Sequence, residues 1–314
     1  MKTGAFIVPT GIGASIGGFA GDASVWARKI AQKCRLIVNP NVINAACFSG
    51  ITNDMLYVEG YTLDEFFKGK LNLVPSDNNK IGVVFDKSIS EKVLNVHINT
   101  INAVKTVYGI DIIGYEITKE DVGVEFFVDS AGNSMGNVSD LATIKESAKN
   151  LLEKGAEAIA IVCKFPEDEN DDYANGIGVD PVGGVEAIIS HYISKELRIP
   201  CAHAPAFENI EISTEIVDPR ASAEYITPTF LPCILIGLSQ APKISTDSGM
   251  NINDIDFLIV PYDATGSIPV FEMSKRNKKI YAIKENKTVL NVTPEKLKFN
   301  CDVISTYEEL FQLL

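Results

Sequence analysis

Short apolar runs alternate with helical patterns along almost the whole chain, and this alternation constrains the fold more than any other feature of the sequence. Several runs are apolar at nearly every position, which is typical of strands covered by helices on both faces. The expected strands lie at 5–9, 35–39, 55–59, 81–86, 112–118, 124–129, 158–163, 200–203, 257–261 and 279–284. The expected helices lie at 22–33, 90–108, 139–154, 180–197 and 305–314. We therefore predict an α/β fold with a mixed, mostly parallel, Rossmann-like sheet and flanking helices.

The domain organisation follows from length and from one break in the alternation. A chain of 314 residues can bury a core without disulfide or metal staples. Two expected strands, 112–118 and 124–129, follow one another directly, which predicts an antiparallel pair. We expect residues 1–314 to form one integrated unit, with two subdomains joined near 119–123 as the alternative. The aperiodic stretch 204–229 is long for a compact domain and is expected to be functional or to cross between subdomains.

The first and last strand–helix–strand units resemble each other. Phe6-Ile7-Val8-Pro9 leads through a small-residue turn and a helix to a strand that ends at Asn39. Phe257-Leu258-Ile259-Val260-Pro261 leads in the same way to a strand followed by Asn286. The pattern is either a pseudo-repeat or the ordinary likeness of two βαβ units. A true repeat would place two turns suited to anions at one edge of the sheet.

The charge balance excludes some partners. Lys and Arg number 28 against 41 Asp and Glu, so the formal charge is −13. That charge repels phosphate backbones and anionic membrane surfaces, and we expect binding to neither nucleic acid nor membrane. No apolar run reaches the roughly 18 residues of a membrane span, the start resembles a strand rather than a signal peptide, and the six cysteines form no C-x-x-C pair. We expect a cytoplasmic protein that binds a small-molecule substrate, and a homo-oligomer stays open.

The strongest local signal is a glycine-rich turn that follows the first strand and opens a helix. Five glycines fall within the eleven positions 11–21. Glycine permits close approach of the backbone to a ligand, and a helix start offers unpaired N–H groups. The turn therefore predicts an anion site, and a tight packing turn is the alternative. The candidate binding residues are Thr10, Gly11, Gly13, Ser15, Gly17, Gly18 and Asp22.

The spacing in this turn argues against a nucleotide cofactor. The dinucleotide fingerprint G-x-G-x-x-G fails because Ile16 stands where the third glycine belongs. Asn39-Pro40-Asn41 replaces the acidic residue expected on the ribose, and no P-loop sequence occurs. We therefore predict no cofactor and keep NAD(P) or a nucleotide as the alternative.

Polar side chains after two other strands are expected to join this site. Asn41 and Asn44 follow the second strand, and Glu285 and Asn286 follow the strand at 279–284. Ligands of open α/β sheets bind at this carboxyl edge, and amides donate well to carboxylates or carbonyls. Turn formation by Asn-Pro-Asn is the alternative for the first group.

Three residues are candidate catalytic groups. The chain has three histidines, and His203 is the one at the end of a strand beside a loop. Alternation puts Cys201 on the same face, about 6–7 Å along the strand. His203 is the expected acid–base residue, and Cys201 or Cys233 is a candidate nucleophile. Asp180 is a further candidate, although its position before Pro181 is also that of a helix N-cap.

Metal binding has weak support in the sequence. The acidic run 167–172 does not fit a calcium loop, because the sixth position counted from Asp168 is Tyr173 and the twelfth is Val179. We expect a solvated loop there, with a lid as an alternative. No metal site is predicted, and weak Mg²⁺ binding by carboxylates stays open.

Several segments resemble one family over the whole chain. The segments are 8–23, 39–44, 56–61, 178–181, 199–206, 229–233 and 285–290. They are similar to a family of bacteria, cyanobacteria and plants known as domain of unknown function number 3326. The resemblance implies one integrated unit and carries no assigned chemistry. Cys163 and the turn 264–267 depart from the family pattern, which argues against a catalytic Cys163 and weakens a second anion turn.

These features together favour a cofactor-independent enzyme, a lyase, isomerase or hydrolase, that acts on a small anionic metabolite held by the glycine-rich turn. An NAD(P)- or nucleotide-dependent enzyme using the same turn is the first alternative. A non-catalytic small-molecule sensor is the second.

Overall fold

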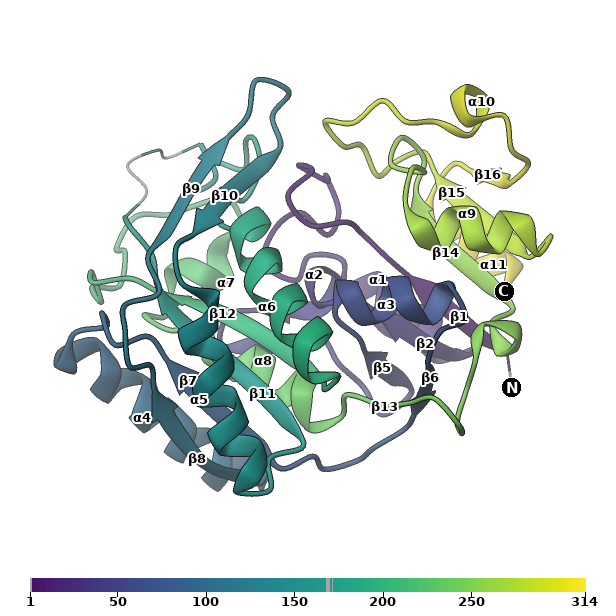
Figure 1. Ribbon diagram of the computed structural model, residues 1–314. Coiled ribbons are helices and arrows are strands. Elements are labelled where there is room, and N and C mark those ends of the chain that lie inside the picture. The colour runs from purple at the N-terminus through teal and green to yellow at the C-terminus, as the bar shows by residue number, and fades with distance from the viewer. Residues whose placement is uncertain (1, 168–169, 171) are drawn as a thin grey trace.

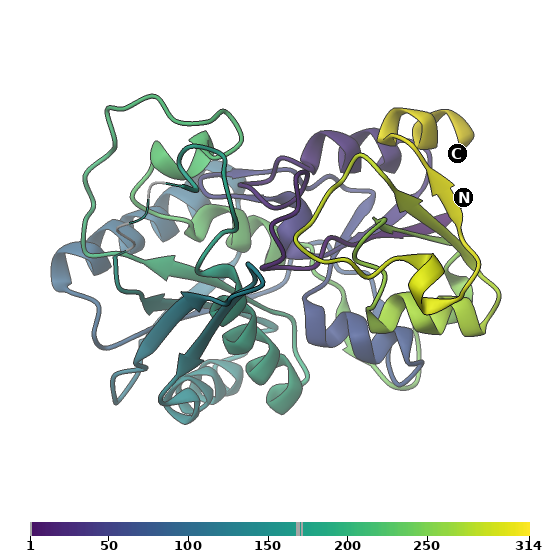
Figure 2. The same cartoon turned by 90° about the horizontal axis from the view of Figure 1, so that it is seen from above.

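The computed structural model describes residues 2–167, 170 and 172–314, and its two largest sheets are each parallel throughout (Figures 1 and 2). The larger sheet has the strand order β16-β15-β14-β1-β2-β5. Its strands are β1 (Thr3–Phe6), β2 (Arg35–Val38), β5 (Met55–Tyr57), β14 (Phe257–Pro261), β15 (Lys279–Ile283) and β16 (Asp302–Ile304). The chain therefore has the predicted Rossmann-like α/β fold.

The smaller parallel sheet has the order β12-β11-β7-β8. Its strands are β7 (Ile81–Phe85), β8 (Ile112–Ile117), β11 (Ala158–Lys164) and β12 (Cys201–Ala206). Both sheets follow doubly wound orders: counted along the chain, the larger is 3-2-1-4-5-6 and the smaller is 2-1-3-4. In such sheets the strand order reverses at one point, and ligands bind outside the carboxyl ends of the strands there.

Helices cover both faces of each sheet. In the larger sheet α1 (Ser24–Ala31) and α11 (Tyr307–Leu313) lie together on one side, and α3 (Gly60–Phe67) packs with α9 (Ile268–Lys275). In the smaller sheet α5 (Leu141–Glu153) and α6 (Gly183–Leu197) pack together, and α4 (Glu91–Tyr108) packs with α8 (Leu231–Ser239). The short helices are α2 (Pro40–Ile43), α7 (Ser222–Tyr225), α10 (Pro294–Leu297) and the 3₁₀ turn η1 (Ile252–Asp254). This covering explains why the strands are apolar at nearly every position.

The antiparallel pairs form small separate ribbons, and one of them corrects an expectation. The strand β8 joins the parallel sheet, and β9 (Val124–Val128) pairs with β10 (Ser134–Val138), so the predicted pairing of 112–118 with 124–129 is wrong. The β9–β10 turn forms because Asp129 accepts hydrogen bonds from the N–H groups of Ala131 and Asn133. The other ribbons are β6 (Asn72–Val74) with β13 (Lys243–Ser245), and β3 (Asn44–Ala45) with β4 (Phe48–Ser49).

The chain passes between the two sheets at 75–80 and again at 239–256. Residues 119–123, where the alternative of two subdomains put their junction, connect β8 to β9. One apolar cluster includes Phe6 and Leu36 of the larger sheet together with Phe85 of the smaller one. Helix α8, which the sequence analysis missed, belongs to this cluster. All but one of its nine residues are buried, so it lacks the amphipathic period by which a surface helix is found.

The first and last βαβ units lie side by side, because β1 pairs directly with β14. The asparagine that follows the second strand of each unit makes the same pair of hydrogen bonds to the backbone. Asn39 bonds both the N–H and the carbonyl of Val8, at 3.1 and 2.7 Å, and Asn286 bonds both groups of Ile16, at 3.0 and 2.7 Å. Each side chain therefore acts as an extra peptide group that fixes the glycine-rich turn.

Among the described residues, no helix is long and apolar enough to cross a membrane.

Candidate functional site

A cavity of about 600 Å³ lies between the two sheets. Residues at the carboxyl ends of the larger sheet line one side, among them Pro9 and Thr10 after β1 and Glu59 after β5. Residues near the carboxyl end of β12 line the other side, among them His203 and Phe207. This is where doubly wound sheets bind their ligands, so the cavity is the candidate site.

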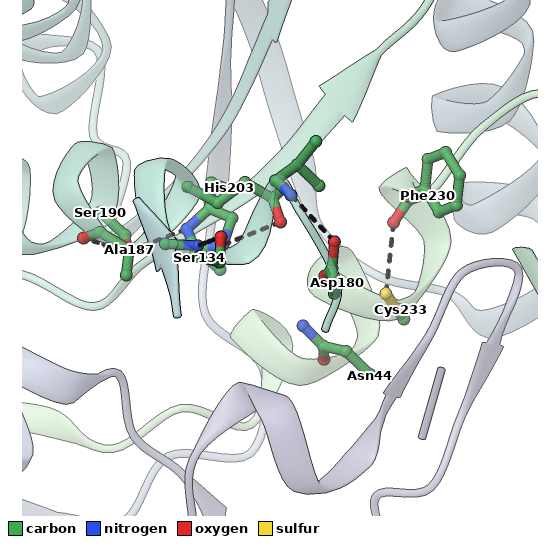
Figure 3. Close-up of polar contacts among 12 residues, drawn as sticks. Asn44, Ser134, Asp180, Ala187, Ser190, His203, Phe230 and Cys233 are labelled. Atoms are coloured by element: carbon green, nitrogen blue, oxygen red, sulfur yellow. Dashed lines mark hydrogen bonds and ion pairs between the residues drawn. The ribbon is translucent and has the colours of Figure 1, made fainter. Parts of the chain in front are cut away.

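His203 is held in one orientation by helix α6. Its Nδ1 lies 2.9 Å from Oγ of Ser190, as Figure 3 shows, and that hydroxyl lies 3.4 Å from the carbonyl oxygen of Ala187. Because the hydroxyl proton is directed to Ala187, we assign the imidazole proton to Nδ1, which donates to Ser190. The unprotonated Nε2 then lies 3.7 Å from Oε2 of Glu186.

Burial shifts the pKa values of His203 and Glu186 in opposite directions. Burial lowers the pKa of His203 to about 3, with a smaller contribution from His191. Burial also raises the pKa of Glu186 well above its usual range, and the nearby carboxylates of Asp180 and Glu224 raise it further. Both shifts favour the uncharged form of the group, which is the imidazole of His203 and the carboxylic acid of Glu186.

Two further carboxyl groups belong to this wall. Burial raises the pKa of Glu224 to about 8, with Asp180 as the next largest cause. Asp180 lines the cavity, and its Oδ1 accepts a hydrogen bond from the N–H of Val182 at 3.1 Å. The N-cap position itself is taken by Val182, because α6 begins at Gly183 rather than at Pro181.

Three backbone N–H groups of the glycine-rich turn are bonded to side chains of the chain itself. Oδ1 of Asp22 accepts from Gly17 at 2.7 Å and from Phe19 at 3.4 Å, while the N–H of Ile16 is bonded to Asn286. Burial raises the pKa of Asp22 to about 6 despite these bonds. The chain's own side chains thus occupy the positions at which a bound anion was expected. Of the predicted residues in this turn, Thr10 and Gly18 line the cavity.

The glycines at 11 and 13 instead pack the turn against distant segments. Gly11 has φ +75°, its carbonyl accepts from the N–H of Ser134, and a Cβ there would lie 3.1 Å from the Ser134 Cβ. Gly13 has φ +56°, and a Cβ there would lie 3.0 Å from Val289. A tight packing turn, the alternative to ligand binding, accounts for both glycines.

Ser15 and Glu285 also make contacts within the chain. The Ser15 hydroxyl accepts from the N–H of Lys287 at 2.8 Å and donates to the carbonyl of Glu285 at 3.3 Å. The Glu285 carboxylate accepts from the N–H of Tyr307 at the start of α11. Neither side chain lines the cavity, and neither does Asn286.

Asn41 and Asn44 do line the cavity. Nδ2 of Asn41 donates to the carbonyl of Gly17, which ties α2 to the glycine-rich turn. Nδ2 of Asn44 donates to the hydroxyl of Tyr57 at 3.1 Å, and its buried Oδ1 has no hydrogen-bond partner among the described residues. Figure 3 shows the Asn44 amide facing Asp180.

The cysteines near the site are poor nucleophiles. Cys201 is 1% exposed and does not line the cavity, and burial raises the pKa of its thiol well above the usual range. Cys233 lines the cavity, but its Sγ donates to the carbonyl of Phe230 at 3.2 Å and burial raises its pKa to about 12. Both side chains therefore stay thiols at neutral pH, and the thiolate is the reactive form.

Several residues of the site were missed from the sequence. Glu186 and Ser190 lie four residues apart on the buried face of α6, and Ser194 continues the row. Polar residues at helical spacing on an otherwise apolar face are the signal that could have found them. Ser134 was also missed: its Oγ accepts from the N–H of Gly184 at 2.8 Å and donates to the carbonyl of Pro181 at 2.7 Å. The remaining acidic and histidine residues missed in the described lining are Glu59, Asp64, Glu167, His191 and Glu224.

No group of three or more His, Cys, Asp or Glu side chains among the described residues is placed to hold a metal ion. The calcium-loop comparison starting at Asp168 lies outside the described residues.

The fold and cavity define a two-sheet α/β protein with a ligand-sized cleft at the carboxyl ends of both sheets. The chain belongs to the family described as protein of unknown function (DUF3326), whose profile matches residues 3–314. It is 37% identical over 317 residues to an "uncharacterized lipoprotein" of Synechococcus sp. strain PCC 6301, an alignment that covers 98% of this chain and 88% of that protein. No solved structure matches the chain.

Proposed function

We propose that this protein is an enzyme that works without a resident cofactor and moves a proton on a small metabolite bound between its two sheets. The observation that carries the proposal is the geometry of His203. The imidazole, oriented by Ser190, presents Nε2 at 3.7 Å from Oε2 of Glu186 at the wall of the cavity. A base and an acid on one wall suit proton abstraction and return, as in an isomerase or lyase.

A hydrolase acting through a cysteine has less support, because the buried thiols of Cys201 and Cys233 have raised pKa values. The anionic substrate expected from the glycine-rich turn also has less support in the structure than in the sequence. Asp22 and Asn286 already bond the N–H groups of Ile16, Gly17 and Phe19.

The test is isotopic. Wild-type protein is incubated in D₂O with a metabolite extract, and the mixture is analysed by mass spectrometry. We expect one small molecule either to gain deuterium or to be consumed. His203→Asn should abolish that change. Ser194→Ala, on the same helix but away from the cavity lining, should retain it. A metabolite change that His203→Asn leaves intact would contradict the assignment, and binding without any turnover would favour the non-catalytic sensor.

A nucleotide-dependent enzyme is the second candidate, and one observation favours it. The strand order 3-2-1-4-5-6 is that of dinucleotide-binding sheets, with the cavity near the point of reversal between β1 and β14. Thermal-shift measurements with NAD, NADP and ATP test it, because a ligand at about a hundred times its dissociation constant adds roughly 2.7 kcal/mol to stability. No shift with any of them would set this candidate aside.

A further inference from the structure

The cavity wall is acidic and has no strong cation of its own. Neither Lys nor Arg occurs among its described lining residues. The basic side chains among these described residues are His191 and His203, and burial lowers the pKa of His203 to about 3. The six carboxyl groups of the lining are those of Glu59, Asp64, Glu167, Asp180, Glu186 and Glu224.

Two polar side chains of the wall have oxygen atoms that accept no hydrogen bond from the described residues. Glu186 is 9% exposed, and no described residue donates a hydrogen bond to its carboxyl group; its Oε2 lies 3.7 Å from Nε2 of His203. The buried Oδ1 of Asn44, on the opposite sheet, also has no partner among the described residues. Buried polar atoms are nearly always paired, so these acceptors call for a ligand that brings N–H donors.

Several of the backbone donors that could hold an anion are already used. In the glycine-rich turn, Asp22 and Asn286 accept from the backbone N–H groups. At the start of α6 the N–H of Gly184 is bonded to Ser134 and that of Val182 to Asp180. A carboxylate or phosphate in the cavity would meet like charge with little to bind it.

From these observations we propose that the cleft takes a cationic organic amine, with its ammonium group beside Glu186 and Glu224. This inference rests on the proposed function, since it takes the cleft to be the substrate site. Aromatic side chains of the lining supply a surface for the hydrocarbon part, and among them Phe19 and Tyr173 stack at 5.0 Å between ring centres. Arg220 is held behind this surface, over the Phe19 ring and bonded to Asp218.

Binding of a cation has a signature beyond affinity. Glu186 faces Asp180, Glu224 and His203, and Glu224 faces Asp180 and Tyr173. An ammonium group among these side chains favours their ionised forms and lowers the raised pKa values of Glu186 and Glu224. Protons are therefore released when the amine binds at neutral pH.

The experiment is calorimetry on the full chain with three probes of equal length: hexamethylenediamine, adipate and hexanediol. We expect millimolar or tighter binding of the diamine only, with a binding enthalpy that differs between Tris and phosphate buffers because protons are released. Glu186→Gln and Glu224→Gln should each weaken binding of the diamine by about tenfold or more and should reduce the number of protons released on binding. Glu211→Gln, in the exposed run 211–216, is the matched control and should bind as wild type does.

Each other outcome overturns the inference in a distinguishable way. Adipate binding without diamine binding would reverse the charge assignment and leave the cleft as the site of the proposed enzyme. Equal diamine binding by wild type, Glu186→Gln and Glu224→Gln would place the amine on the acidic surface. No binding of the diamine at all would remove the cationic class, while the D₂O experiment would still decide the proposed function.

Discussion

Nδ1 of His203 lies 2.9 Å from Oγ of Ser190, thirteen residues earlier in the chain. The contact joins β12 to α6 and decides which imidazole nitrogen faces the cavity. With the proton on Nδ1, the basic Nε2 is directed toward Glu186 and the space where a substrate would lie.

Ser190→Ala should therefore release the imidazole from a single tautomer. We expect long-range ¹H–¹⁵N correlation spectra of wild type to show His203 as the Nδ1–H form, and the variant to show a mixture or the other form. Ser194→Ala is the control, because its hydroxyl has no hydrogen-bond partner among the described residues. An unchanged His203 spectrum in Ser190→Ala would contradict the assigned role.

Glu224→Gln should stabilise the protein at alkaline pH. Glu224 ionises near 4.5 in the unfolded chain but near 8 when folded, so the folded state binds more protons between these values and stability falls as pH rises. Between pH 5 and pH 8 we expect wild type to lose on the order of 2 kcal/mol relative to Glu224→Gln, allowing for screening by water in the cavity. Urea titrations at the two pH values measure the difference, and Glu211→Gln should follow wild type.

Asp22→Ala should loosen the glycine-rich turn. The variant leaves the N–H groups of Gly17 and Phe19 without their acceptor, at an expected cost of about 1–3 kcal/mol. Hydrogen exchange should accelerate at these two amides. Asp140→Ala, which removes a comparable pair of hydrogen bonds at the start of α5, should destabilise that helix and leave exchange in the turn unchanged.

Gly184→Ala should be more harmful than Gly178→Ala. A Cβ at position 184 would lie 2.2 Å from the backbone oxygen of Ser134, so α6 must move away from β10. At position 178 a Cβ meets nothing within 4 Å, and the cost is that of φ +80° alone. We expect losses of about 3 kcal/mol or more and about 1 kcal/mol respectively, measured by thermal or urea unfolding. Equal losses would contradict the close packing of α6 on β10.

Strand and helix positions were largely predictable because the signal for them is local. The runs at 5–9, 35–39, 257–261 and 279–284 became β1, β2, β14 and β15, since burial on both faces requires apolar side chains at successive positions. The strand β10, which pairs with β9, and the helix α8 were missed because their local signal is weak. Ser-Met-Gly-Asn-Val carries little strand signal, and α8 is buried all round.

The site could be predicted only in part. His203 was found because few histidines exist and one follows a strand, and Thr10, Gly18, Asn41, Asn44 and Asp180 do line the cavity. The roles of Asp22 and Asn286 as hydrogen-bond acceptors for the turn could not be predicted. The sequence shows that a turn has N–H donors, but it does not show which acceptors reach them. Asn286 lies 270 residues from its partner Ile16.

The sequence by itself determined the α/β class, five of the six strands of the larger sheet and the glycine-rich turn, because hydrophobic period, burial and backbone freedom depend on neighbouring residues. The edge strand β16 was not predicted. Only the tertiary structure decided that the turn is fixed by the chain's own Asp22 and Asn286. It also decided that Glu186, Ser190 and His203 meet across α6 and β12 at an acidic cavity. Contacts between distant segments follow from strand order and packing, and no local pattern records which side chains those choices bring together.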